Sequence, residues 1–201
     1  NASDLSAIGS KTSGIVTVSN AAAISGTTAQ FTAALVTADT LVAAGTSHLT
    51  ITDAHTLAQL KDINNLTTGT ITLNDYSVAL TGTAADVVAA LSGTFAAAYT
   101  GNVTINDANG TSIAAVDLNT IAGDTSGTVT VSNNINITGT SAAVATAVGN
   151  VDTFSGTPTA ALSNAHTISQ LKTINDAVSG TLTLNSYAVA LDGTAADVKA
   201  A

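Results

Sequence analysis

The sequence repeats itself, and this limits what the chain can fold into more than any other feature. Four segments share a Ser or Thr, a Gly and an alternating stretch centred on Thr: residues 13–20, 68–75, 126–133 and 179–186. Their starts lie 55, 58 and 53 positions apart, so the chain holds about three and a half copies of a unit near 55 residues. Repeats of this length are typical of proteins in which each copy packs on the next.

Two further blocks recur between these segments. Residues 53–64 (DAHTLAQLKDIN) match residues 164–175, and residues 78–86 (VALTGTAAD) match residues 189–197. The copies divide the chain into a partial repeat at 1–48, a repeat at 49–102, a divergent repeat at 103–159 and a partial repeat at 160–201. Because the pattern breaks off inside a copy, we expect one continuous array that is a segment of a longer protein.

Within one copy the hydrophobic period changes from that of a strand to that of a helix. Residues 49–53 and 70–74 alternate apolar with β-branched polar side chains, which predicts half-buried strands. Leu57, Leu60 and Ile63 follow Thr56 at helical spacing, which predicts a helix with Thr56 as its N-cap. A second helix is predicted to open at residues 83–86 and to close at Gly93, and its equivalents are residues 140–148 and 194–201.

The spacing of the strands predicts how they pair. The predicted strands begin near residues 15, 49, 70, 103, 128, 161 and 181, with alternately long and short connections of about 33 and 21 residues. Similar strands joined by crossovers of this length favour parallel pairing. We therefore predict a mainly β fold with short helices, a parallel β-solenoid (α/β-solenoid). A string of compact α/β modules is the alternative.

Charge and hydropathy exclude several classes of partner. The net charge is −9, from 13 acidic residues that are all Asp against four Lys and no Arg. Nucleic acid is excluded, because phosphate binding requires clustered Lys or Arg. No apolar run approaches the roughly 18 residues of a membrane-spanning helix. The absence of Cys fits a protein that is secreted without disulfides.

A series of Asp and Asn residues is the first candidate site. Each follows the last apolar residue of its strand by two: Asn20, Asp53, Asp75, Asp107, Asn133 and Asn164. Such residues commonly cap turns by accepting hydrogen bonds from nearby backbone N–H groups. In one sheet they would lie about 4.8 Å apart, where carboxylates repel unless a cation bridges them. The alternative is therefore a calcium site at Asp53, Asp75 and Asp107.

Threonines form the second candidate site. Three copies carry a Thr-x-Thr pair opposite their apolar face, at Thr70 and Thr72, Thr128 and Thr130, and Thr181 and Thr183. Arrays of this kind resemble the ice-binding surfaces of some antifreeze solenoids, which implies a face for ice or polysaccharide. The alternative is that Thr, a good strand residue, solvates the outer face.

The histidines do not predict catalysis. His55 and His166 occupy the same repeat position, so we expect a structural role beside the start of a helix. The sequence contains no Ser/His/Asp order, zinc-protease helix, phosphate loop or Cys cluster. We expect no enzymatic activity and no firmly indicated cofactor other than the calcium considered above.

The two long repeated blocks resemble repeat arrays of giant cyanobacterial and proteobacterial secreted surface proteins, of the adhesin or surface-layer type. Residues 109–117 depart from the pattern, since they replace the His-Thr-Leu-x-Gln-Leu block. The resemblance implies a non-catalytic structural or adhesive module at the cell surface, commonly with calcium. We expect self-association through the ends or edges of the array, and surface polysaccharide as a further partner.

Overall fold

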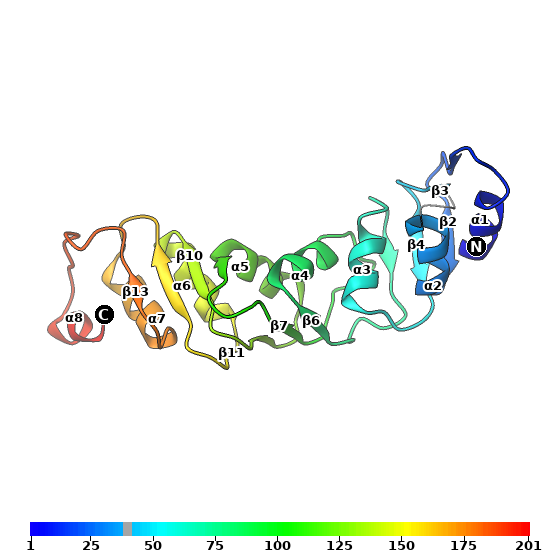
Figure 1. The fold of residues 1–201 in the computed structure, drawn as a ribbon. Helices are drawn as coiled ribbons and strands as arrows, with labels where there is room; N and C mark the ends of the chain where they lie inside the picture. The colour runs from blue at the N-terminus through cyan, green and yellow to red at the C-terminus, as the bar shows by residue number, and fades with distance from the viewer. Residues whose placement is uncertain (38–41) are drawn as a thin grey trace. The chain divides into compact units, whose positions relative to one another are not determined.

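The computed structural model describes residues 1–37 and 42–201, and it is an α/β protein with parallel sheets (Figure 1). Eight α-helices occur among these residues, and the helices hold more residues than the strands. The prediction of a mainly β fold is therefore wrong. The observed strands have only two to four residues each, because Ala-rich stretches of the chain form helices instead of longer strands.

The chain forms two compact units. The first contains residues 1–80, 85–102 and 124–127, and the second contains residues 81–84, 103–123 and 128–201. The α-helices are α1 (Ala2–Gly9), α2 (Thr28–Phe31), α3 (Leu57–Asn64), α4 (Ala84–Leu91), α5 (Ala115–Asp124), α6 (Ser141–Asn150), α7 (Ile168–Ala177) and α8 (Ala195–Ala200). A π-helix, η1 (Thr32–Val36), continues α2.

Four parallel sheets accompany the helices in the described part of the chain. The first unit holds β1 (Val16–Thr17) with β3 (Val42–Ala43), and β2 (Ala23–Gly26), β4 (His48–Ile51) and β5 (Ile71–Thr72) in that order. A four-stranded sheet has the order β11 (Thr153–Phe154), β9 (Val129–Val131), β7 (Val103–Ile105) and β6 (Leu80–Gly82). The last sheet is ordered β13 (Leu182–Thr183), β12 (Thr159–Leu162), β10 (Asn136–Gly139) and β8 (Ser112–Ala114).

Neighbouring strands are separated by a nearly constant length of chain. Val16 pairs with Val42, Leu49 with Ile71, Val103 with Val129 and Asn136 with Thr159, so partners lie 22 to 26 positions apart. The seven predicted strands do alternate between longer and shorter connections, since they begin at residues 16, 48, 71, 103, 129, 159 and 182, but further strands lie between them and supply neighbours that the sequence analysis did not include. Strands are present near all seven predicted starts. The strands missed by the sequence analysis are β2, β3, β6, β8, β10 and β11.

The strands place their apolar side chains in the core. Val103, Ile105, Val129 and Val131 are at most 1% exposed, whereas Thr104 between the first two is half-buried. This alternation is the one expected of a sheet with a single buried face.

The predicted helix starts are confirmed. The Thr56 side chain accepts from the Gln59 N–H, and Gln59 accepts from the Thr56 N–H, which forms a capping box at the start of α3. Thr140 and Thr194 cap α6 and α8. On α3 the predicted apolar residues Leu60 and Ile63 are fully buried.

The Gly of the Ser/Thr-Gly segments permits close contact between backbones. A Cβ on Gly69 would overlap the Ser47 carbonyl, and one on Gly127 would overlap the Gly101 carbonyl. The Thr two residues earlier secures each approach: Thr67 Oγ1 donates to the Ser47 carbonyl at 2.6 Å and accepts from the Gly69 N–H. Packing between neighbouring segments thus explains the repeated Gly at Gly69, Gly127 and Gly180, whereas a Cβ on Gly14 of the first segment would meet nothing closer than 3.6 Å.

The divergent residues 109–117 also have a structural explanation. Residues 112–114 form β8, which runs directly into α5 at Ala115. The segment therefore corresponds to the strand-to-helix junctions at β6–α4 and β10–α6, and no loop like that of residues 52–56 is present. Gly110 has a positive φ of 82°, which favours glycine in the turn before the strand.

Candidate functional site

Three of the predicted strand-end residues cap helices that lie earlier in the chain. Asp53 Oδ1 accepts from the Thr28 N–H at 2.8 Å, Asp107 Oδ2 from the Ala84 N–H at 2.7 Å, and Asn164 Oδ1 from the Ser141 N–H at 2.7 Å. Thr28, Ala84 and Ser141 are the first residues of α2, α4 and α6, whose N–H groups have no partner within the helix. We call these three pairs the cap series. They join segments 23 or 25 residues apart, so the caps are not the local turn caps expected from the sequence.

The remaining strand-end residues make other contacts. Asp75 Oδ1 accepts from the Ser77 hydroxyl at 2.7 Å and from the Ser77 N–H at 2.8 Å, and these hydrogen bonds lower the pKa of Asp75. The Asn133 amide donates to the carbonyls of Asn106 and Asp107. The Asn20 carbonyl accepts from the Ala22 N–H.

This arrangement does not bring the three predicted calcium ligands together among the described residues. Over residues 1–37 and 42–201, no group of three or more His, Cys, Asp or Glu side chains is placed to hold a metal ion. Of the three predicted ligands, Asp53 and Asp107 hold helix N-termini and Asp75 closes a turn. Calcium binding at these residues stays a prediction.

Threonines align across neighbouring strands, but they are not all the threonines that the sequence predicted. We call the aligned series Thr104, Thr130 and Thr153 the threonine column. Thr130 pairs in register with Thr104 on one side and Thr153 on the other, and Thr72 pairs with Thr50. Thr183 pairs with Ala161. Thr70, Thr128 and Thr181 lie two residues earlier, where their carbonyls accept from the N–H groups of Leu49, Val103 and Ala160. Each Thr is thus aligned with a residue on the adjacent strand, and the 55-residue repeat does not give the neighbour spacing.

His55 belongs to a buried polar network in the first unit. Its Nε2 lies 3.1 Å from the Tyr99 hydroxyl, and Tyr99 donates to the Val78 carbonyl at 2.6 Å. Burial lowers the pKa of His55 from its ordinary value of 6.5, against the opposing charges of Asp75 and Asp53. Burial also raises the pKa of Tyr99. His55 is 4% exposed, and its structural role fits the expectation from its repeat position.

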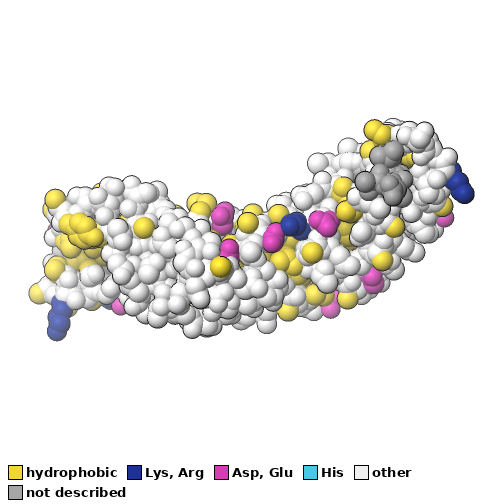
Figure 2. All heavy atoms as spheres, viewed as in Figure 1, with side chains coloured by type: hydrophobic (Ala, Val, Ile, Leu, Met, Phe, Trp, Pro, Cys, Tyr) yellow, Lys and Arg dark blue, Asp and Glu magenta, His cyan; other side chains and the backbone are white. Residues whose placement is uncertain are grey.

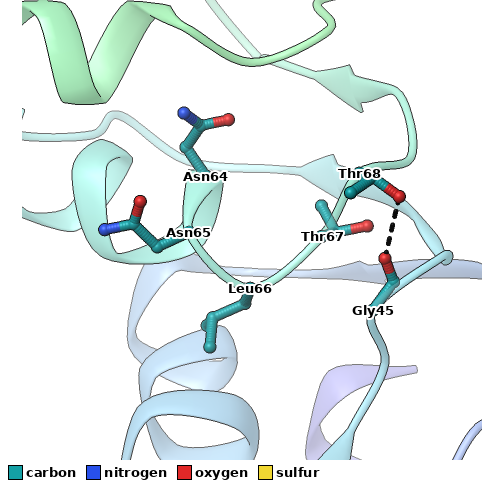
Figure 3. Close-up of a pocket in the computed structure, with 6 residues that line it drawn as sticks. All are labelled: Gly45, Asn64, Asn65, Leu66, Thr67 and Thr68. Carbon is teal, nitrogen blue, oxygen red and sulfur yellow. Dashed lines mark hydrogen bonds between the residues drawn. The ribbon is translucent and has the colours of Figure 1, made fainter.

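An open hollow of about 290 Å³ lies beside the end of α3 (Figure 3). Its lining residues are Gly45, Asn64, Asn65, Leu66, Thr67 and Thr68. Thr68 donates to the Gly45 carbonyl at 3.1 Å, as the dashed line in Figure 3 marks. The Asn64 amide is bonded to Ala89 and Ser92. Among the residues that the structure describes, the lining contains no acid or base for proton transfer, and most of its polar groups already hold neighbouring segments together.

Asparagines that the sequence analysis did not single out form a further series in the second unit. Asn109 Oδ1 accepts from the Asn134 N–H at 2.9 Å, and Asn134 Oδ1 accepts from the Thr157 N–H at 2.7 Å. The Gly110 N–H returns a bond to the Asn134 carbonyl. The sequence signal for this series is the spacing of 25 and 23 residues between the bonded partners, and it can be recognised only when the strand register is known.

Comparisons with known proteins do not assign the chain to a family. Family models, curated proteins and solved structures all give no match. None of the helices in the described part of the chain has the length and apolar character needed to cross a membrane.

Proposed function

We propose that the chain is a non-catalytic structural module of a bacterial surface protein, in which the parallel pairing continues as a solenoid. A coil here means one helix together with the strands that lead to the next helix. The observation that carries the proposal is the cap series, in which a side chain of one coil holds the first N–H of the preceding helix. The same bond occurs in both units, which supports a common rule of assembly.

The use of polar groups also supports a structural role. The Asn64 amide donates to the Ala89 carbonyl, Asn119 to Ala143 and Asn175 to Ala200, and each bond joins one helix to the next. Side chains that an enzyme would direct into a cleft thus serve here as connections between coils. A repeated module built in this way acts as a spacer, a filament segment or part of a surface coat.

The proposed location is outside the cell. It is supported by the resemblance of the long repeated blocks to secreted surface arrays, and by an acidic sequence without Cys. Antibodies raised against the chain should label intact cells of the source organism. Labelling only after the cells are permeabilised would contradict the proposed location.

Substitution of the cap series tests the structural proposal. Asp53→Ala in the first unit and Asn164→Ala in the second should each lower the free energy of unfolding by about 1 kcal/mol, because each leaves the first N–H of a helix without its acceptor. Unchanged stability of both variants in urea unfolding would contradict the proposal, because the cap series would then not hold the coils together.

A second candidate function is binding of polysaccharide or ice by the threonine column. The in-register series Thr104, Thr130 and Thr153 supports it, because aligned hydroxyls on parallel strands repeat about every 4.8 Å. Thr130→Tyr should abolish glycan-array binding or thermal hysteresis. Thr120→Tyr, on the exposed side of α5, is the control and should leave either activity unchanged. Wild-type protein that is inactive in both assays would remove this candidate.

A further inference from the structure

The divergent residues 109–117 begin with an Asn-Gly pair that the proposed function does not use. Asn109 and Gly110 are the only such pair in the sequence, and both residues are exposed. They form the centre of a turn that the Thr111 N–H closes by donating to the Ala108 carbonyl at 3.0 Å. Gly110 has a φ of 82°, which is typical of the third residue of a type II turn.

An Asn-Gly pair contains all the groups for a spontaneous reaction of its own backbone. The Gly110 nitrogen, once it has lost its proton, can attack the Asn109 Cγ and close a cyclic imide, while the side-chain nitrogen leaves as ammonia. Glycine favours this attack because no Cβ obstructs the approach of its nitrogen.

Water then opens the imide to one of two products. Cleavage of the bond between Cγ and the Gly110 nitrogen leaves Asp, whereas cleavage at the main-chain carbonyl leaves isoaspartate, in which the chain runs through Cγ. Over both steps water is consumed and ammonia is released, so no other reactant is needed.

Steric cover does not protect this pair in the folded chain, but two hydrogen bonds hold its reacting groups. Nothing lies within 4 Å of the position that a Cβ on Gly110 would take. The Gly110 N–H donates to the Asn134 carbonyl at 2.6 Å, and Asn109 Oδ1 accepts from the Asn134 N–H at 2.9 Å. The first bond favours the protonated nitrogen, which cannot attack. The second fixes the orientation of the Asn109 amide.

The residue that supplies both bonds is itself anchored. Asn134 Oδ1 accepts from the Thr157 N–H at 2.7 Å. All three segments belong to the second unit, so one continuous set of hydrogen bonds restrains the Asn-Gly turn.

From this geometry we infer that Asn109 is a deamidation site, which the hydrogen bonds to Asn134 suppress and which separation of the two segments activates. The inference concerns chemical modification of the chain and does not rest on the proposed function. The reaction proceeds from the opened turn, so its rate in the folded chain follows the fraction of time for which these bonds are broken.

The two products differ in whether the contact with Asn134 can form again. Asp retains a side-chain oxygen that accepts from the Asn134 N–H. Isoaspartate adds a methylene to the main chain before Gly110, which displaces the start of β8, where Ser112 pairs with Asn136. After refolding, the isoaspartate product should therefore have a lower urea midpoint than the Asn109→Asp variant.

Either product adds a carboxylate to a surface with few charges. The chain has 13 Asp and four Lys, and Figure 2 shows uncharged side chains and backbone over most of the visible face. Ion-exchange chromatography therefore separates both products from the intact chain. Peptide mass spectrometry and enzymatic methylation of isoaspartate then identify the modified residue and the product.

Conversion rates in the folded and the unfolded chain test the inference. In mildly alkaline buffer, Asn109 should convert at least about tenfold more slowly in the folded chain than in guanidinium chloride. Ser186→Gly supplies the control, because it places a second Asn-Gly pair at the exposed Asn185. Neither the Asn185 side chain nor the Ser186 N–H has a hydrogen-bond partner among the described residues. Asn185 in this variant should convert at a similar rate in both conditions, and circular dichroism establishes that the variant is folded.

Two results would overturn the inference. If Asn109 converts in the folded Ser186→Gly variant as fast as Asn185 does, the bonds to Asn134 do not protect it. If Asn109 stays intact in guanidinium chloride, it is not a deamidation site. Gly110→Ala should lose most of the conversion in guanidinium chloride, because its Cβ obstructs the attacking nitrogen, and this loss identifies the Gly110 nitrogen as the nucleophile.

Discussion

The His55 imidazole donates to the Tyr99 hydroxyl, and this bond of 3.1 Å joins residues that are 44 positions apart. Tyr99 directs its own proton to the Val78 carbonyl, which has no proton to give. The Tyr99 oxygen is therefore the acceptor for His55, and the proton of the neutral ring lies on Nε2. His55 Nδ1 is buried and has no hydrogen-bond partner among the described residues. Protonation would place a second N–H there with no acceptor, which agrees with the direction of the pKa shift.

The lowered pKa of His55 predicts that the fold weakens in mild acid. In the unfolded chain the group binds its proton as the pH falls through 6.5, whereas the folded chain resists protonation to lower pH. The free energy of unfolding should therefore fall below pH 6.5, by at most about 1.4 kcal/mol per pH unit for one group. Urea unfolding between about pH 5 and pH 8 measures this slope.

Nuclear magnetic resonance of the His55 ring separates its contribution from those of the carboxylates. It should report the Nε2–H tautomer and a pKa below 6.5. Asp75→Asn should lower that pKa further, because the Asp75 charge favours the imidazolium. A His55 that titrates at or above its ordinary value would contradict the buried network.

Substitution of Gly69 tests the close approach of neighbouring segments. In Gly69→Ala the new Cβ meets the Ser47 carbonyl, so we expect a loss of stability of about 1–3 kcal/mol, the range for overpacking. Gly149→Ala is the control, because nothing lies within 4 Å of its Cβ position inside α6. The control should gain about 0.5–1 kcal/mol from helix propensity. Equal effects of the two substitutions in chemical denaturation would argue against the approach.

Much of the fold was accessible from the sequence, because local patterns determine local structure. The helix at Thr56 was predicted from a capping residue and three apolar residues at helical spacing, and α3 begins at Leu57. The strand β11 was missed, since its two residues Thr153 and Phe154 give too short a stretch for an alternation to be recognised. The fold class was predicted with too much β, because the helices α1, α2 and α5 were not predicted and the strands have only two to four residues each.

The candidate site was predicted less well, because it depends on register between distant strands. The repeat suggested that Thr130 and Thr183 are aligned, yet Thr130 pairs with Thr104 and Thr153. Similar sequence recurs about every second coil, while contact occurs between adjacent coils. The residue types at Asp53 and Asp107 correctly indicated capping, but the partners lie 25 and 23 residues earlier in the chain.

Substitutions of Asp107 distinguish a capping role from calcium binding. The Asp107 carboxylate accepts the Ala84 N–H, so Asp107→Ala should cost about 1 kcal/mol and Asp107→Asn only a few tenths. Capping requires no metal, so we expect the same melting temperature in calcium and in EDTA. A melting temperature that rises with calcium, and no longer does so in Asp107→Asn, would establish the calcium site instead.

Core truncation on α5 tests the inward face of a single coil. Leu118 is fully buried, so Leu118→Ala should cost about 2–5 kcal/mol. Val116 on the same helix is 59% exposed, and Val116→Ala should change the free energy of unfolding by no more than about 0.5 kcal/mol. Thermal and urea unfolding measure both changes. A similar cost at the two positions would mean that α5 is turned differently on the sheet.

Disulfide cross-linking is the most direct measurement of the strand register, and the chain has no native Cys to interfere. A disulfide requires Cα atoms within about 7 Å, which adjacent parallel strands satisfy and strands two positions apart do not. Cysteine pairs at Thr104 with Thr130 and at Thr130 with Thr153 should therefore cross-link on mild oxidation, while Thr104 with Thr153 should not. A cross-link between Thr130 and its repeat equivalent Thr183, with none between Thr104 and Thr130, would contradict the register on which the coils depend.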